Sequence, residues 1–390
     1  MTNIHKAIRN IFIMILGGIV CICFLTAVKD NWKATAYKVI HTKDIGVVET
    51  INEIKSLYTT IPAQNKLLQI DSLRQKFFNY YIYKATDELI IRDQDGRLTE
   101  LIGAQDPSIL TREADNLLIL RDYCSLENIP LVYIRAPYKA EQYADRLPEG
   151  MVDYSENNAD EFCKLLTDHD VDVLDLRHDL TGEDVFYYTD HHWQISSAWK
   201  AASMVAAHVS EIKGFENVQS EQISDLHNYY TITYDDFLGS YGRRTGAVWS
   251  GTEKFTYILP DFDTEIHYQH KVDEKIVIDK TGDFRQALIS DPDESDYYCS
   301  YLNNSYMEML IDNLKPHNDK KVLLLSDSFG RTMGSFLSLY FDELVNLDTQ
   351  DERYDDSILE YVDTYQPDIV MIMFNDGMFS YPSTFERLGR

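Results

Sequence analysis

Short runs of apolar residues alternate along the chain with stretches in which apolar residues recur every three or four positions. Runs of this length, bounded by turn residues, are typical of buried strands, whereas the three-to-four-residue period is typical of helices. The predicted strands span 130–135, 171–176, 321–325, 343–348 and 368–374. The predicted helices begin near Thr111, the expected N-cap of the first, and continue at 157–168, 197–209, 330–341 and 355–364. This alternation predicts an α/β fold with a parallel sheet covered on both faces.

The alternation breaks between about residues 210 and 314, where Asp, Tyr, Ser and Gly are frequent. Three runs in this region, FTYILP, EIHYQH and KIVID, have the pattern of antiparallel strands. We interpret the region as a β-rich insertion over the edge of the sheet where a site is expected. Upstream, ELIIRDQDGRL predicts two short strands around a turn at Asp95-Gly96.

Residues 11–28 form an apolar segment of 18 residues without a charge. At about 1.5 Å per residue, a helix of this length just spans a hydrocarbon core of about 30 Å. Lys6 and Arg9 precede the segment, and positive charge on the short N-terminal side favours a cytoplasmic N-terminus. The alternatives are a cleaved signal peptide and a buried core helix. The pattern predicts a single-pass protein of the cell membrane whose globular part is extracytoplasmic.

These patterns divide the chain into three predicted regions. Residues 1–28 are the cytoplasmic tip and membrane anchor, and residues 29–105 are a juxtamembrane helical stalk with a hairpin. Residues 106–390 are the α/β domain, with the insertion at about 210–314.

The charge and cysteine content narrows the classes of partner and cofactor. Lys and Arg number 36 against 64 Asp and Glu, and the net charge of −28 argues against nucleic acid as a partner. Beyond the predicted anchor the chain has only Cys124, Cys163 and Cys299. This odd number cannot complete a disulfide framework, and the spacing is not that of a zinc site. We therefore predict neither a metal nor a cofactor.

The first candidate for chemistry is Asp190-His191-His192-Trp193, which lies between a predicted strand and a predicted helix. In an Asp-x-His spacing the carboxylate of Asp190 can orient the imidazole of His192 and stabilise its protonated form. A structural turn, in which Asp190 caps the helix and Trp193 packs, is the simpler alternative. A metal site is a further alternative, since carboxylate and imidazole are common ligands and Asp-His-His occurs in a class of phosphoesterases.

The second candidate is Ser326-Asp327-Ser328, which follows the predicted strand 321–325 and precedes a helix. Backbone N–H groups at a helix N-terminus favour negative charge and can hold the oxyanion of a tetrahedral intermediate. A serine hydroxyl needs a base to become a nucleophile, and His192 is the expected base for Ser328. A helix N-cap is the alternative role for Ser328, and Asp327 is also expected to cap.

Basic residues near these segments are candidates for substrate contact in an acidic chain. Arg135 ends a predicted strand, Lys139 follows it, and Arg243 and Arg244 lie in the loop GSYGRRTG. The alternative is that they form local ion pairs with the many carboxylates.

Together these motifs resemble the bacterial DHHW family, which is named for the tetrapeptide at Asp190–Trp193, and the similar SGNH-hydrolase-like domain of alginate O-acetyltransferases. The resemblance covers about residues 86–380 and includes the DGRL turn, IRAPYK, VDVLDL, FLGSYG at 237–242 and the Ser-Asp-Ser turn. It implies an SGNH-hydrolase-like three-layer sandwich with a parallel sheet, a β-rich insertion and an N-terminal transmembrane helix.

The same resemblance implies roles for individual residues. Ser328 matches the nucleophile, Asp190 and His192 match the pair that completes the triad, and Asn375 matches the oxyanion-hole asparagine. Ser326 departs from the pattern, which has glycine there. The spacing favours His192 over His191 as the base.

The resemblance implies a membrane-anchored O-acetyltransferase or esterase that acts on a cell-surface polysaccharide through an acyl-serine intermediate. It also implies a membrane-bound O-acyltransferase as the partner that donates acetyl groups. The alternative function is a non-catalytic glycan-binding or scaffold subunit of a polysaccharide-modification complex. A metal-dependent phosphoesterase is a third possibility.

Overall fold

The computed structural model describes residues 64–85, 88–272, 275–292, 296–305, 307–315, 318–349, 357–380 and 383–389. The chain divides into two compact units, Met1–Asn79 and Tyr80–Arg390. Helix α3 (Gln64–Phe77) belongs to the first unit. The second unit contains the elements described below, including the predicted hairpin around Gly96.

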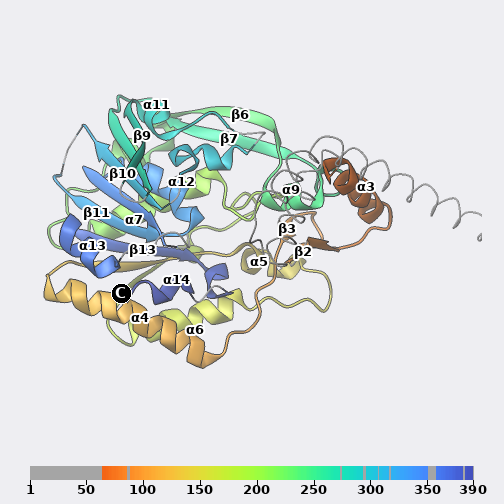
Figure 1. The fold of residues 1–390 in the computed structure, drawn as a ribbon, viewed down its shortest axis with the longest axis horizontal. Coiled ribbons are helices and arrows are strands. Elements are labelled where there is room, and N and C mark those ends of the chain that lie inside the picture. The colour runs from red at the N-terminus through yellow and green to blue at the C-terminus, as the bar shows by residue number, and fades with distance from the viewer. Residues whose placement is uncertain are drawn as a thin grey trace, which may run out of the picture. The chain divides into compact units, whose positions relative to one another are not determined.

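The second unit is built on an eight-stranded mixed sheet (Figure 1). In order across the sheet, its strands are β5 (Asp172–Asp175), β4 (Leu131–Ala136), β13 (Ile369–Asn375), β11 (Lys321–Ser326), β12 (Glu343–Asp348), β10 (Glu308–Asn313), β8 (Ile266–Val272) and β9 (Lys275–Gly282). The first five strands are parallel to one another. The last three pair antiparallel, and β10 joins them to β12.

The predicted strands are all present in the parallel half of this sheet, within about one residue of their predicted ends. The predicted parallel sheet is one part of a mixed sheet, because β8, β9 and β10 continue it as antiparallel strands. These three strands come from the predicted insertion, which therefore extends the sheet rather than only covering its edge. Pairing with β10 removes the unpaired backbone edge that β12 would otherwise present.

Helices cover both faces of the sheet and give three layers (Figure 1). On one face lie α7 (Ile195–Val209) and α12 (Ser328–Leu337); on the other lie α4 (Pro107–Leu126), α6 (Ser155–Thr167), α13 (Ile358–Tyr365) and α14 (Ser383–Glu386). Successive side chains of β11 point to opposite faces of the sheet. Leu324 lies in the core on the side of α7 and α12, and Leu325 lies in the core on the side of α4 and α6. Both are fully buried, which explains the continuous apolar runs of the central strands.

Helix α4 begins five residues earlier than the sequence predicted, since its N-cap is Asp106 and not Thr111. Its N-cap is Asp106, whose side chain accepts a hydrogen bond from the Ser108 N–H, and Pro107 occupies the first helical position. Thr111 lies inside the helix and donates its hydroxyl proton to the Pro107 carbonyl. The sequence Asp106-Pro107 therefore indicates the start of this helix better than Thr111 does.

Smaller sheets and short helices complete the second unit. A three-stranded sheet consists of β1 (Ile82–Ala85), β2 (Glu88–Arg92) and β3 (Leu98–Thr99), and a hairpin consists of β6 (Tyr229–Phe237) and β7 (Glu253–Pro260). The short helices are α5 (Lys139–Gln142), α8 (Glu221–Ser224), α9 (Ser240–Thr245), α10 (Ala247–Ser250) and α11 (Phe284–Leu288). Short 3₁₀ helices lie at Ala144–Arg146, Leu176–His178, Leu226–Asn228, Tyr298–Ser300, Leu302–Asn304 and Asp376–Ser380. The turn predicted at Asp95-Gly96 joins β2 to β3 antiparallel, and Gly96 has a positive φ of 93° there.

The predicted localisation requires correction. In the ranges given above, no helix is long and apolar enough to cross a membrane. Residues 11–28, on which the predicted anchor rested, lie outside the described residues. Neither the single-pass localisation nor the transmembrane helix of the predicted fold class is retained.

Ser326, which departs from the family pattern, packs beneath the first turn of α12. Its hydroxyl donates to Asn346 Oδ1 at 2.8 Å, and Asn346 Nδ2 donates to the Gly330 carbonyl at 3.1 Å. A Cβ atom at Gly330 would overlap the Ser326 side chain. The serine is therefore accommodated because residue 330 has no side chain.

Gly330→Ala tests whether the serine at position 326 depends on the missing side chain at position 330. We expect Gly330→Ala to lower the free energy of unfolding by about 1–3 kcal/mol, because it overpacks a buried contact. Adding Ser326→Gly removes the overlapping atoms, so the double variant should lose less than the sum of the single variants. Urea unfolding of the three proteins measures this. Additive losses would contradict the packing argument.

Candidate active site

The carboxyl end of β11 leads directly into α12, as the Ser-Asp-Ser motif predicts. Asp327 is the N-cap of α12: its backbone is extended, and its Oδ1 accepts a hydrogen bond from the Phe329 N–H at 2.9 Å. Ser328 is the first residue of the helix. Its N–H therefore lies in the first turn, where backbone donors have no acceptor within the helix. The predicted capping role of Asp327 is confirmed, and Ser328 is partly exposed.

The loop before α7 brings Asp190–Trp193 to the same place. Phe186 and Trp193 form an antiparallel bridge, and the Tyr187 N–H donates to the His192 carbonyl at 3.2 Å. The Trp193 indole is fully buried against Phe329 and donates to Thr332 Oγ1 at 3.1 Å. Trp193 thus fixes the loop to α12, which carries Ser328.

Ser328, His192 and Asp190 form a continuous hydrogen-bonded chain. His192 Nε2 lies 2.7 Å from Ser328 Oγ, and His192 Nδ1 lies 2.6 Å from Asp190 Oδ1. Asp190 and His192 are 1% and 6% exposed, respectively. The geometry is that of a nucleophile, a general base and a carboxylate that orients the base. The residues predicted as a triad are therefore brought together by the fold.

His191, the alternative base, has a different partner. Its Nδ1 lies 2.7 Å from Ser240 Oγ, and its ring stands next to that of His192 with centroids 3.7 Å apart. Burial and the neighbouring imidazole lower the pKa of His191 to about 3. The geometry favours His192, which alone of the two is hydrogen-bonded to Ser328.

A metal site at this loop is less consistent with the contacts. The ligand atoms of Asp190, His191 and His192 lie within 4.8 Å of one another, as a metal site would require. However, both ring nitrogens of His192 are hydrogen-bonded to protein groups, and a metal would have to displace one of them. The donor set therefore fits proton transfer better than metal binding.

Asp190 is held as an anion by several donors. Its Oδ2 accepts from the Ser240 N–H at 2.5 Å, and its Oδ1 accepts from the His192 N–H at 2.9 Å. Burial alone would raise the pKa of Asp190, but the two imidazoles and these hydrogen bonds hold it well below its ordinary value. Ser240 belongs to FLGSYG, one of the segments on which the family resemblance rests. This segment therefore supports the Asp190 carboxylate.

The backbone just before the triad is held by two charged residues from distant elements. Lys139 Nζ donates to the carbonyls of Tyr188 at 3.0 Å and Asp190 at 2.8 Å. Glu253 accepts from the N–H groups of Tyr188 at 2.7 Å and Thr189 at 2.6 Å. Lys139 was predicted to contact substrate, but it is only 1% exposed. Its side chain instead fixes the loop that carries Asp190. Burial lowers the pKa of Lys139 to about 7.

Tyr298, which lies in the region 210–314, packs against the imidazole of His192. Its ring is stacked on His192 with centroids 3.9 Å apart and an interplanar angle of 13°. Its hydroxyl is hydrogen-bonded to Thr332 Oγ1 at 2.9 Å. Sequence reasoning missed Tyr298 and Glu253, because no local motif links either residue to the triad.

The pKa of His192 gives a pH dependence for any reaction that uses it as a base. Burial lowers this pKa, and the Asp190 carboxylate offsets only part of the effect. The base acts as the neutral imidazole, so kcat/KM should fall as the pH drops through this pKa. We expect the midpoint of the acid limb to lie below about 6.5 in a pH profile of ester hydrolysis. A midpoint above about 7 would contradict the assignment.

Asn375 ends β13, next to β11, and lies on the wall of the same cavity as Ser328. Its side-chain Nδ2 donates to Asp327 Oδ2 at 2.6 Å, and its backbone N–H donates to the same oxygen at 2.8 Å. Its Oδ1 accepts from the Gly377 N–H at 2.9 Å. These contacts fix the amide, whose nitrogen carries a second hydrogen.

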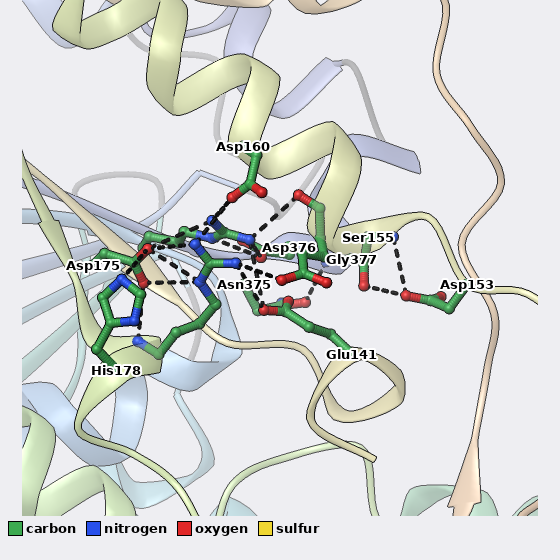
Figure 2. Close-up of polar contacts among 12 residues, drawn as sticks. Glu141, Asp153, Ser155, Asp160, Asp175, His178, Asn375, Asp376 and Gly377 are labelled. Atoms are coloured by element: carbon green, nitrogen blue, oxygen red, sulfur yellow. Dashed lines mark hydrogen bonds and ion pairs between the residues drawn. The ribbon is translucent and has the colours of Figure 1, made fainter. Parts of the chain in front are cut away.

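Arg135 also takes a position different from the predicted substrate contact. Its guanidinium is 1% exposed and donates to Asp376 Oδ2 from two nitrogens, at 2.7 and 2.8 Å. It donates to Asp160 at 2.5 Å as well, and Figure 2 shows the carboxylates of Asp160, Asp376 and Glu141 gathered in this cluster. Arg135 is thus neutralised within the protein and anchors the turn that follows Asn375.

A cavity of about 510 Å³ opens beside Ser328. Its walls include Ser328, His191, Asn375, Tyr138, Tyr241 and Arg244. Of the three predicted substrate-binding residues, only Arg244 lines this cavity. Arg243 points elsewhere, because it pairs with Asp296 at 2.8 Å and lines a separate cavity.

Comparison with known proteins supports the fold and the family resemblance. Residues 102–241 match the model of the SGNH hydrolase-like domain of the acetyltransferase AlgX. The structure is similar to PatB1 from Bacillus cereus, with a TM-score of 0.64 and 18% identity over 76% of this chain and 99% of that chain. A structure of PatB1 with a sulfonyl adduct gives a TM-score of 0.61 with the same identity and coverage.

A DHHW family protein from Eubacterium siraeum is similar as well, with a TM-score of 0.59 and 20% identity over 78% of this chain and 96% of that chain. No curated protein matches the sequence. The predicted resemblance to the DHHW family and to SGNH-hydrolase-like acetyltransferase domains is confirmed. The α/β fold with a large sheet and an SGNH-like domain is confirmed with it.

Proposed function

We propose that this protein is a polysaccharide O-acetyltransferase or esterase that works through an acetyl ester of Ser328. The observation that carries the proposal is the hydrogen-bonded chain from Ser328 Oγ through His192 to Asp190, which ends at a cavity large enough for a sugar unit. The match of residues 102–241 to an acetyltransferase domain supports the same class of reaction.

The first half-reaction transfers an acetyl group to the enzyme. His192 Nε2 removes the Ser328 hydroxyl proton as Oγ attacks the acetyl carbonyl carbon, and the carbonyl electron pair moves to oxygen. When the tetrahedral intermediate collapses, the bond to the donor oxygen breaks, and protonated His192 returns the proton to this leaving group. Asp190 keeps the imidazole oriented and stabilises its protonated form.

The oxyanion would be stabilised by donors that the fold already fixes. The Ser328 N–H lies in the first turn of α12, where the helix dipole favours negative charge. The second hydrogen of Asn375 Nδ2 is the other donor, because Asp327 uses the first. Donors fixed in advance need no reorganisation as charge develops.

The second half-reaction releases the acetyl group. A sugar hydroxyl or water attacks the serine ester, and His192 accepts its proton and then returns a proton to Ser328 Oγ. Attack by a sugar hydroxyl gives an acetylated polysaccharide, and attack by water gives acetate. The membrane-bound O-acyltransferase that would supply acetyl groups stays a prediction.

Trapping of the acyl enzyme tests this proposal. The full chain is incubated with an activated aryl acetate, quenched in acid, and digested for mass spectrometry, with and without an oligosaccharide acceptor. We expect one acetyl group on the peptide that contains Ser328, and its transfer to the acceptor. A sulfonyl fluoride should compete for the same serine.

The outcome separates the two function classes. No ester turnover, no acetyl-Ser328 and no sulfonylation would contradict the proposal and favour the non-catalytic glycan-binding or scaffold alternative. Acetylation of Ser328 with acetate as the only product would identify an esterase.

A further inference from the structure

One end of the Ser328 cavity is charged, and its charges do not balance. Its walls include the carboxylates of Glu88 and Glu100 and the guanidinium of Arg244. Arg244 forms an ion pair with Glu88 and lies 3.7 Å from Glu100 Oε1. The single guanidinium of Arg244 therefore lies beside two carboxylates.

The other charged residues near the cavity are buried in the protein, where neighbouring groups offset their charges. Lys139 is buried between backbone carbonyls near the anionic Asp190, and Arg135 is paired with Asp376. Burial keeps His191 neutral, as its lowered pKa indicates. With both carboxyls ionised, the described residues that line the cavity carry one more negative than positive charge.

Glu100 carries an unused acceptor in this wall. Its Oε1 is buried from solvent and accepts no hydrogen bond within the described part of the chain. The Glu100 side chain keeps 24% of its surface exposed in this wall, so a ligand hydroxyl or ammonium group can reach the carboxylate and donate a hydrogen bond to it. A ligand carboxylate has no proton to donate at neutral pH and would be repelled.

The rest of the cavity suits a sugar ring. Tyr138 and Tyr241 lie in the wall together with apolar residues such as Leu89 and Met378. Arg244 also donates from Nε to the Ser240 carbonyl at 3.1 Å, and the Ser240 N–H holds Asp190. The charged wall and the triad are therefore attached to one helix, α9, which fixes their separation.

We infer that Glu88, Glu100 and Arg244 select an acceptor sugar that has hydroxyl or amino groups but no carboxylate, so that neutral and amino-sugar polymers are accepted and polyuronates are rejected. This inference rests on the proposed function, because it assigns the acceptor of the same site. In it, Arg244 does not bind a substrate carboxylate. It holds the two glutamates in place, and Glu100 accepts a hydrogen bond from the sugar.

The test is a binding measurement that does not need catalysis. Full-length Ser328→Ala protein is titrated by calorimetry with three oligosaccharides of equal length, made of glucose, glucosamine or glucuronate. Burial raises the pKa of Glu100, so the titration is run at about pH 8, which favours the ionised form of this carboxyl. We expect the glucuronate oligomer to bind at least about tenfold more weakly than the glucose oligomer.

Charge-neutralising variants assign the discrimination to residues. In the Ser328→Ala background, Glu100→Gln and Glu88→Gln should each reduce the difference to about threefold or less, because each removes the excess negative charge. Glu149→Gln, the same change at an exposed position away from the cavity, should keep the difference of the parent protein. Added salt should weaken the discrimination.

Each outcome bears on one claim. Equal or tighter binding of the glucuronate oligomer, or no binding of any oligomer, overturns the inference whether or not Ser328 is a nucleophile. Discrimination that survives both glutamine variants overturns the assignment to these residues. Failure to form acetyl-Ser328 in the wild-type protein contradicts the proposed function and leaves this binding order unaffected.

Discussion

Replacement of Ser328 by alanine is expected to lower kcat/KM for an activated acetyl ester by at least about 10³-fold. The alanine has no oxygen to attack the ester, and His192 Nε2 loses the partner that lies 2.7 Å away. The helix N-terminus and the cavity remain, so binding of the ester should change little. Steady-state ester hydrolysis, with acyl-enzyme detection by mass spectrometry, measures both quantities.

Ser335→Ala is the matched control, because it removes a hydroxyl from the same helix. The Ser335 hydroxyl donates to the Arg331 carbonyl within α12 and does not line the cavity. This variant should keep ester hydrolysis within about threefold of wild type, since only a local helix hydrogen bond is lost. If the two variants behave alike, Ser328 is not the nucleophile.

Replacement of Gly239 by alanine is expected to lower kcat by about 10²-fold, although Gly239 has no functional group. A Cβ atom at this position would lie 2.6 Å from both the Cα and the backbone N of Asp190. Backbone cannot move aside as a flexible side chain can, so Asp190 must shift relative to His192. Misplacement of a catalytic group by about 1 Å can cost this much in rate.

The control for Gly239 is Gly103→Ala, because a Cβ at Gly103 has no neighbour within 4 Å. Gly103→Ala should leave kcat and the melting temperature nearly unchanged. Thermal unfolding by circular dichroism shows whether Gly239→Ala stays folded, so that a loss of rate can be attributed to the site. Full activity in a folded Gly239→Ala protein would contradict a supporting role for FLGSYG at Asp190.

The sequence by itself determined the elements of the parallel half and the candidate residues for catalysis. Apolar runs such as 368–374 indicate strands buried on both faces, because the length of a run, its residue types and its bounding turn residues are local properties of the chain. The motif at Asp190–Trp193 and the turn at Ser328 were recognisable because residue type and spacing alone constrain them. Local pattern also indicated that Asp327 caps α12.

Tertiary structure decided which distant groups meet. The sequence offered Arg135, Lys139 and Arg244 as equivalent cations, but burial places two of them on protein carboxylates and carbonyls and only Arg244 at the cavity. Likewise, the strands from 210–314 could be assigned a type but not a partner, and they extend the sheet next to β12. Pairing, burial and charge compensation depend on residues far apart in the chain, and no local period records them.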